Sequence, residues 1–253
     1  MEILNEYAET YLPKIQDKSV ALILIDPPYG MIRNTQTWDT VPDWIFIKRQ
    51  FERILQDNGQ LYIFGKQPMM SDLYQDIRDI FEFRFEIIWN KEKGIWASNH
   101  QPIGSHELIW CFKKSRSRAT ELKFYPDRIK TPGKPYKKWN RPKTSTVRSF
   151  ETGSWTINTG GRFPKSVITH SPIYKGHEEY LPHPTQKPEE IIRWILESST
   201  DPGDTVMDCY LGSGTTAAVA LKLDRNFTGC EKDPEYFKMT MERIKEIENQ
   251  KKL

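Results

Sequence analysis

The sequence predicts an α/β fold, in which a doubly wound, mostly parallel sheet of seven strands carries a loop-rich insertion. Two observations predict it. Short apolar, β-branched runs alternate with amphipathic helical patterns over most of the chain, and such alternation favours a parallel sheet covered on both faces. With 253 residues, the chain can form one large domain with an insertion, or two small domains.

Seven runs have the composition of strands and are bounded by turn residues. They cover Glu2–Leu4, Val20–Ile25, Gln60–Phe64, Phe83–Trp89, Glu107–Phe112, Thr205–Cys209 and Phe227–Glu231. The turn sequence "DNG" (57–59) precedes the third run, and "DPGD" (201–204) precedes the sixth. These signals place the predicted strand starts.

Five segments repeat apolar residues with the helical period. They cover Trp44–Gln56, Met69–Ile80, Glu189–Ser199, Thr215–Leu223 and Pro234–Glu248. Proline stands at the start of two of these helices, as Pro188 and Pro234, which is a favoured position for it.

One segment interrupts the alternation. Residues 115–182 are rich in Lys, Arg, Pro, Gly, Ser and Thr, yet they keep aromatic residues such as Trp139 and Trp155. A disordered linker normally holds fewer aromatic residues, so we expect an inserted subdomain that orders on a partner. The chain then divides into a first catalytic half (1–114), the insertion (115–182) and a second half (183–253) that completes the same α/β domain.

Basic charge is concentrated in the same region. The whole chain has 37 basic and 34 acidic residues, whereas Lys113–Arg148 alone has 13 Lys and Arg against two acids. This distribution indicates contact with a polyanion. A solvated charged face is the alternative interpretation.

Several classes of protein are excluded by the sequence. The three cysteines, Cys111, Cys209 and Cys230, lie in apolar runs without metal-ligand spacing, which predicts buried thiols, a reducing compartment and no metal site. The N-terminus lacks the pattern of a signal peptide, and no window approaches the ~18 apolar residues of a membrane span. We therefore expect a soluble, cytoplasmic protein with no membrane partner.

A glycine-rich turn joins two predicted strands near the C-terminus, in "DTVMDCYLGSGTTAAVALKLDRNFTGCEKD" (204–233). The first strand ends at Asp208, Gly212-Ser213-Gly214 forms the turn, and the second strand ends at Glu231. In a βαβ unit an acid at the end of the second strand, here Glu231, accepts hydrogen bonds from a ribose diol, while glycines let the backbone approach a ligand. The unit therefore indicates a nucleoside-cofactor site.

The same loop argues against a nucleotide phosphate. A phosphate loop has Lys followed by Ser or Thr after its second glycine, and the pyrophosphate fingerprint has a third glycine; neither is present. Asp208 also repels phosphate. It suits a cationic ligand such as S-adenosylmethionine.

The first long strand ends in "DPPY" (26–29). One interpretation is a structural acidic turn. The other is a site for an exocyclic amine on a heterocycle, whose nitrogen must pyramidalise before it can attack a methyl sulfonium. The Asp26 carboxylate and the Pro27 carbonyl can accept its two N–H groups in the geometry of the attacking nitrogen, the proline ring restricts the backbone, and Tyr29 offers a face for stacking.

The two motifs together resemble the amino-methyltransferases of DNA, which transfer a methyl group from S-adenosylmethionine to adenine N6 or cytosine N4. "DPPY" comes first, then the basic segment, then "HPTQKPEEII" (183–192), then the glycine loop. This order resembles the β group of the family and spans nearly the whole chain. It implies a Rossmann-like fold, a prokaryotic or phage origin, and S-adenosylhomocysteine as the second product.

The resemblance also implies roles for individual residues. The target-amine site comprises Asp26, Pro27, Pro28 and Tyr29. The cofactor site comprises Asp208, Tyr210, Gly212, Ser213, Gly214, Thr215 and Glu231, with Thr185 and Lys187 of "HPTQKP" at the methionine end of the cofactor. The chain departs from the family in two places: it has Asp208-Cys209-Tyr210 where Asp-Pro-Phe is usual, and Asn5-Glu6 where Gly-Asp is frequent. We expect Tyr210 to stack on the adenine ring of the cofactor.

The resemblance places target recognition in the basic insertion. The predicted DNA-binding residues are Lys130, Lys134, Lys137, Lys138, Arg141, Lys143 and Arg148. Lysines supply salt-sensitive phosphate contacts, and an arginine can read base edges. The target base must swing out of the helix, and the loop with Arg33, Asn34 and Trp38 is a candidate lid, while residues 93–107 are a second candidate lining of the target pocket.

Several alternatives remain open at this point. An initial Asp in "DPPY" favours N6-adenine over N4-cytosine, although "GSHELIWCF" and "GRFPKSVI" resemble a subgroup labelled cytosine N4. Methylation of RNA or of a protein amide is a further alternative, as is a DNA-binding subunit without catalysis. The family also suggests a homodimer.

Overall fold

The computed structural model describes residues 1–30, 40–95, 99–100, 102–140 and 154–251. These form two compact units, one of Met1–Phe124 with Ser166–Leu253, and one of Tyr125–Lys165. The predicted insertion (115–182) is wider than the second unit, because its flanks belong to the larger one. Among the described residues, no helix is both long and apolar enough to cross a membrane.

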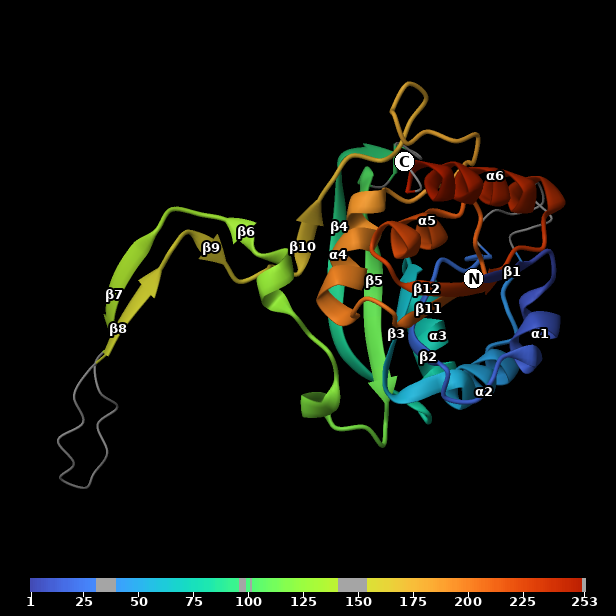
Figure 1. Cartoon of the computed structure of the whole chain (residues 1–253), viewed down its shortest axis with the longest axis horizontal. Coiled ribbons are helices and arrows are strands. Elements are labelled where there is room, and N and C mark those ends of the chain that lie inside the picture. Colours follow the sequence, from blue (N-terminus) through green and yellow to red (C-terminus); the bar gives the residue numbers. More distant parts are fainter. Residues whose placement is uncertain (31–39, 96–98, 101, 141–153, 252–253) are drawn as a thin grey trace. The chain divides into compact units, whose positions relative to one another are not determined.

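The larger unit is built on an eight-stranded sheet (Figure 1). The order is β1 (Glu2–Leu4), β12 (Asn226–Cys230), β11 (Thr205–Asp208), β2 (Val20–Ile25), β3 (Leu55–Gly65), β5 (Gly104–Lys114), β4 (Phe81–Ile95) and β10 (Val167–Thr169). Strand β5 is antiparallel to β3 and β4, and the other pairings are parallel. The prediction of a mostly parallel, Rossmann-like sheet is confirmed.

The prediction of seven strands missed β10. This strand has only three residues, and it pairs with β4 so that Val167 lies opposite Ile88. Its neighbours in the sequence are loop-rich, so periodicity gave no signal. Strand β3 also begins earlier than predicted: Val20 pairs with Leu55 and Leu22 with Gln60, so the "DNG" turn bulges out of a continuous strand.

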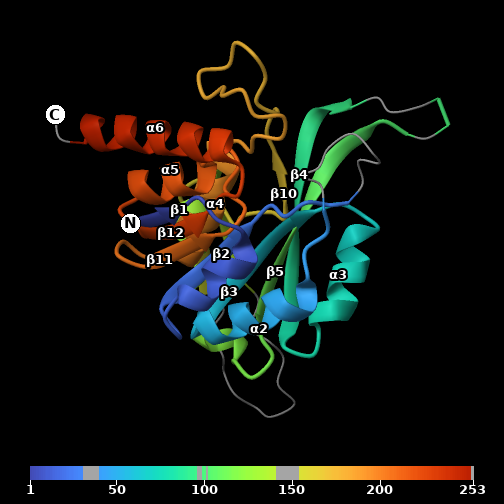
Figure 2. The ribbon, with the colours of Figure 1, turned by 90° about the vertical axis from the view of Figure 1, so that its right-hand side faces the viewer.

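Helices cover both faces of the sheet (Figure 2). One face packs against α1 (Ala8–Tyr11), α2 (Trp44–Ile54) and α3 (Met69–Ile77), and the other against α4 (Glu189–Ser199), α5 (Thr215–Lys222) and α6 (Pro234–Gln250). Short 3-10 helices cover Leu12–Lys14 and Ala119–Glu121. The strands serve both cores because successive side chains point to opposite faces: Ile23 lies in the first and Leu22 in the second.

The strand order creates a crevice at one edge of the sheet. The chain passes from β2 through α2 to β3 on one side, and from β11 through α5 to β12 on the other. In open α/β sheets, ligands bind outside the carboxyl ends of the strands, at the point where the connections that follow two neighbouring strands lead in opposite directions. Asp26 directly follows β2 and Asp208 ends β11, so both lie at this point.

The smaller unit consists of two short antiparallel ribbons and a 3-10 helix (Pro126–Ile129). Strand β6 (Thr131–Pro132) pairs with β9 (Gly161–Arg162), and β7 (Tyr136–Asn140) pairs with β8 (Ser154–Asn158). In the second ribbon Trp139 lies opposite Trp155, with ring centroids 5.1 Å apart. Such a cross-strand aromatic pair stabilises a two-stranded ribbon.

Candidate active site

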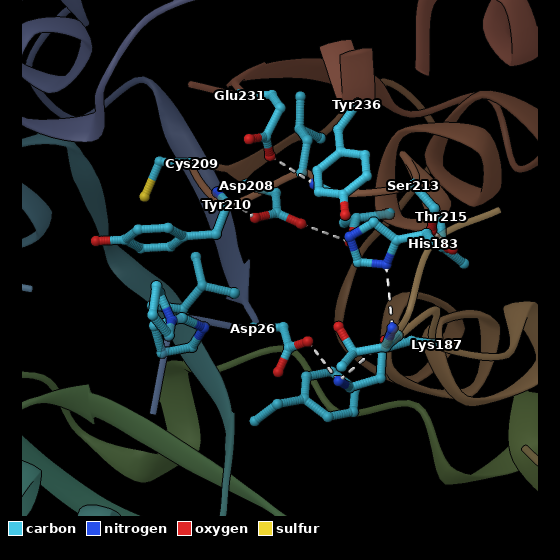
Figure 3. A pocket seen from close by; sticks show the side chains of 18 of the residues that line it. Asp26, His183, Lys187, Asp208, Cys209, Tyr210, Ser213, Thr215, Glu231 and Tyr236 are labelled. Carbon is cyan, nitrogen blue, oxygen red and sulfur yellow. Dashed lines mark hydrogen bonds and ion pairs between the residues drawn. The ribbon is translucent and has the colours of Figure 1, made fainter. Parts of the chain in front are cut away.

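A cavity of about 690 Å³ opens at the carboxyl ends of the strands. All four residues predicted for the target amine line it, as do eight of the nine predicted for the cofactor; Gly214 is not among them. Figure 3 shows Asp26 and Lys187 on one side, with Asp208, Glu231 and the glycine loop on the other. Residues 182 positions apart in the sequence, Asp26 and Asp208, thus share one cavity.

Both carboxylate oxygens of Asp26 are engaged. Tyr29 Oη donates to Oδ1 at 2.7 Å, and Lys187 Nζ donates to Oδ2 in a short ion pair. Each oxygen keeps a further lone pair, since a carboxylate has about four acceptor sites. Asp26 is therefore oriented by the protein and can still accept N–H groups from a ligand.

Lys187 is buried between two carboxylates. Its Nζ also lies 3.5 Å from Glu107 Oε2 and 5.2 Å from the centroid of the Phe64 ring. Burial lowers the pKa of Lys187, but Asp26 and Glu107 raise it by more, so the net pKa is above the usual value. Lys187 is thus a cation beside Asp26, and its place at the methionine end of the cofactor stays a prediction.

Glu107 has no assigned role in the sequence motifs, although it ends the segment 93–107 that we considered as pocket lining. It is brought to the cavity because β5 runs antiparallel, so its first half lies beside the carboxyl ends of β3 and β4. Lys91 Nζ donates to Glu107 Oε1 at 2.5 Å, and Lys66 Nζ lies 3.7 Å from the same oxygen. Burial raises the pKa of Glu107, but Lys187, Lys91 and Lys66 lower it to about 2, so the group is ionised.

Asp208 is almost completely buried at the end of β11. The Tyr210 backbone N–H donates to Oδ1 at 2.9 Å, and Thr216 Oγ1 donates to Oδ2 at 2.8 Å. Burial raises the pKa of Asp208 to about 7, and the neighbouring carboxylates Asp26 and Glu231 add to the increase. A cationic ligand is favoured at such a carboxylate because it stabilises the ionised form.

Glu231 follows β12 and holds the glycine loop. The Gly212 N–H donates to its Oε2 at 2.8 Å, and the Asp233 N–H donates to Oε1 at 2.9 Å. Gly212 and Gly214 have φ values of +52° and +72°, in the region that favours glycine. A β-carbon on Gly212 would meet His183 Nε2 at 2.8 Å, so the absence of a side chain also lets His183 pack on the loop.

Sequence motifs did not assign His183 and Tyr236, which line the same cavity. Their rings make an edge contact with centroids 4.5 Å apart. Burial and the nearby Lys187 lower the pKa of His183 to about 4, so it is neutral near pH 7.

The sequence left the roles of Asn5 and Glu6 open. Asn5 donates from Nδ2 to the Glu231 carbonyl at 2.7 Å, and Glu6 lines the cavity.

Tyr210 lines the cavity with its hydroxyl directed into the protein, where that oxygen is buried without a hydrogen-bond partner among the described residues. Ser213 and Thr215 are buried, and their hydroxyls lie 3.2 Å apart. Arg243 donates to Thr215 Oγ1 at 3.1 Å and to the Ser213 carbonyl at 3.0 Å. The loop is therefore fixed from behind by α6.

The predicted DNA-binding residues fall in the smaller unit. Four of them, Lys130, Lys134, Lys137 and Lys138, are exposed. Arg141, Lys143 and Arg148 lie outside the described residues, as do the candidate lid residues Arg33, Asn34 and Trp38. The structure describes no group of three or more His, Cys, Asp or Glu residues that could hold a metal ion.

Comparisons with known proteins define the class. The fold is that of DNA methyltransferases. A solved structure of the PvuII DNA methyltransferase, described as cytosine-N4-specific, aligns with a TM-score of 0.69 at 15% identity, covering 98% of this chain and 91% of that one. The structure of an M1.HpyAVI–SAM complex aligns with a TM-score of 0.62 at 22% identity, covering 96% and 98%.

Sequence comparisons then give the family. The model of the N6 and N4 DNA methylases matches residues 20–242, so the chain belongs to this family. It is 31% identical over 239 residues to the type II methyltransferase M1.MboII of Moraxella bovis, covering 89% of each chain. It is 30% identical over 258 residues to the DNA adenine methyltransferase YhdJ of Escherichia coli, covering 96% of this chain and 82% of that one.

Proposed function

We propose that the protein transfers a methyl group from S-adenosylmethionine to the exocyclic amine of a base flipped out of DNA, with adenine N6 as the preferred target. The observation that carries this proposal is the meeting of Asp26 and Asp208 in one cavity, at the ends of adjacent strands. The volume of about 690 Å³ lies within the usual range of ligand sites, roughly 300–1,000 Å³.

The residues on the Asp208 side fit the cofactor. Glu231 is placed at the second strand end, where an acidic side chain accepts hydrogen bonds from a ribose diol. The buried carboxylate of Asp208 favours a positive group. When bound, S-adenosylmethionine supplies a methyl group on a cationic sulfur, which leaves as the neutral thioether of S-adenosylhomocysteine.

The residues on the Asp26 side fit an amine that is a poor nucleophile. The lone pair of an exocyclic amine is delocalised into the ring of the base. The Asp26 carboxylate and the Pro27 carbonyl accept its two N–H groups, so that the lone pair points at the methyl carbon. Fixed acceptors of this kind act without reorganisation at the moment of reaction. The nitrogen becomes cationic as the new N–C bond forms, and it then releases a proton through Asp26.

Adenine is preferred over cytosine for two reasons. An initial Asp in "DPPY" is the commoner form among the adenine enzymes that the sequence resembles, and the relative YhdJ is described as an adenine methyltransferase. The second candidate is cytosine N4, which the same acceptors can hold; the sequence similarity of "GSHELIWCF" and "GRFPKSVI" to a cytosine-N4 subgroup favours it.

The test of this proposal identifies the product. The purified protein is incubated with labelled S-adenosylmethionine and mixed genomic DNA, the DNA is digested to nucleosides, and the labelled nucleoside is identified by mass spectrometry. We expect N6-methyladenine. N4-methylcytosine would change the target base, and the absence of label in DNA would overturn the proposed function.

The smaller unit supports binding to DNA. Three of its exposed lysines, Lys134, Lys137 and Lys138, lie on or next to the β7–β8 ribbon, where Trp139 and Trp155 are 44% and 55% exposed, and Lys130 directly precedes β6. Lys137 Nζ lies 4.4 Å from the centroid of the Trp155 ring. Cations interleaved with exposed aromatic rings suit contact with phosphates and bases.

Replacement of Lys137 and Lys138 by glutamine is expected to weaken DNA binding and to flatten its salt dependence. Each phosphate contact contributes about 0.9 to the slope of log K against log salt concentration, so the double variant should lose up to about 1.8. The slope is measured by fluorescence anisotropy with a labelled duplex. Lys238 and Lys245, exposed on α6, provide the matched control; an equal loss in both double variants contradicts a specific role for the ribbon.

A further inference from the structure

Lys187 lies between two carboxylates but donates to only one of them. Its ammonium is paired with Asp26 Oδ2, and Glu107 Oε2 is 3.5 Å away on the other side. The second distance exceeds the usual range of about 2.7–3.2 Å for an N–H···O hydrogen bond. Under the proposed function, Asp26 also accepts the target amine through a further lone pair, so the Lys187 ammonium and the amine meet at the same carboxylate.

Glu107 Oε2 is an acceptor without a donor. It is buried and accepts no hydrogen bond from the residues that the structure describes. The other oxygen of Glu107, Oε1, accepts a hydrogen bond from Lys91 and lies near the Lys66 ammonium. The ion-pair contact of Oε2 among the described residues is the long one to Lys187. A buried charged oxygen that accepts no hydrogen bond is costly, so a native structure that keeps one requires an explanation.

The position of the lysine affects the charge at the reacting nitrogen. While the ammonium is paired with Asp26, it neutralises the carboxylate beside an amine that becomes cationic during transfer. As the ammonium moves toward Glu107, less of the negative charge of Asp26 is neutralised beside the amine. Closing the 3.5 Å separation to a hydrogen bond requires Nζ to move by less than about 1 Å, which the flexible lysine side chain allows.

We propose that Glu107 is a positioning residue that takes the Lys187 ammonium from Asp26 when the target amine binds. This inference rests on the proposed function and gives a role to Glu107, to which the sequence motifs assigned none. Glu107 touches neither base nor cofactor in this mechanism. It acts through Lys187, while Lys91 holds the Glu107 carboxylate in place and is itself held 4.6 Å from the centroid of the Trp89 ring.

The test is a rescue experiment on Glu107→Gln. In this variant Lys187 has Asp26 as its one remaining carboxylate among the described neighbours, so it stays there and neutralises the charge that faces the amine. We expect kcat to fall about tenfold or more, with little change in the affinity for S-adenosylmethionine or in KM for DNA. Adding Lys187→Met removes the cation from Asp26, so the double variant should be faster than Glu107→Gln alone.

A merely structural role gives the opposite result, because two damaging changes in one site normally slow the enzyme further. The matched control is Glu82→Gln, which removes a carboxylate from the buried Lys113 at the other end of the β4–β5 pair; its kcat should stay at the wild-type value. If Glu107→Gln fails to fold because Lys91 loses its carboxylate partner, the comparison is made with Lys91→Met present in every variant.

The outcomes separate the two proposals. Wild-type protein that methylates DNA, together with a double variant no faster than Glu107→Gln, overturns the role of Glu107 and leaves the proposed function standing. Unchanged kcat in Glu107→Gln does the same. Wild-type protein that transfers no methyl group overturns the proposed function and this inference with it.

Discussion

Replacement of Asp26 by alanine is expected to lower the rate of methyl transfer by at least about 100-fold, the usual cost of losing one preorganised group that stabilises a transition state. The affinity for S-adenosylmethionine should change little, because the side of the cavity that we propose for the cofactor is built from Asp208, Glu231 and the glycine loop. The rate is measured in single turnover with labelled cofactor and DNA, and the affinity by calorimetry.

The control for this variant is Asp79→Ala. Asp79, like Asp26, accepts from a buried lysine: Lys48 Nζ donates to it at 2.8 Å. Asp79 does not line the cavity. Loss of this ion pair therefore tests whether an unpaired buried lysine by itself lowers the activity of the protein. Equal losses of rate and of cofactor affinity in Asp26→Ala would contradict the assignment of Asp26 to the target amine.

Much of the larger unit could be predicted because its signals are local. The β-branched run Val20–Ile25 was assigned as a strand with the bounds that the structure gives, and α4 covers Glu189–Ser199 as predicted. Strand β10 and the antiparallel placement of β5 could not be read from the sequence. Both depend on which strands meet across the sheet, and the three residues of β10 lie within a loop-rich segment that gives no strand signal.

The cavity shows the same division between local and distant information. Motif residues that follow strand ends could be named, because parallel strands bring their carboxyl ends to one edge. The pairing of Lys187 with Asp26 joins residues 161 positions apart. Glu107 reaches the cavity because β5 runs antiparallel to β3 and β4. A single glutamate in the apolar run "ELIWCF" (107–112) gives no signal of a buried ion-pair cluster.

The pH dependence of cofactor binding should follow Asp208. Its pKa is raised to about 7 by burial, so the carboxyl is protonated below this pH and ionised above it. A cationic ligand binds the ionised form, and its affinity is therefore full above about pH 7 and is lost as the pH falls through that value, by up to tenfold per pH unit. His183, with a pKa of about 4, stays neutral over the same range.

Calorimetry with S-adenosylmethionine between pH 6 and pH 8.5 measures this dependence. Asp208→Asn should bind weakly at every pH and show no slope, because the amide cannot ionise. Glu231→Gln is the matched control: it removes the other buried acid at a strand end, for which we propose a neutral diol as partner, and the slope should persist.

A second ligand identifies the partner of Asp208. S-adenosylhomocysteine keeps the amino group of the cofactor and lacks its cationic sulfur. A slope that persists with this ligand assigns the amino group as the partner, whereas a slope seen only with S-adenosylmethionine assigns the sulfonium. Wild-type affinity that is independent of pH for both ligands would show that Asp208 does not pair with a cation.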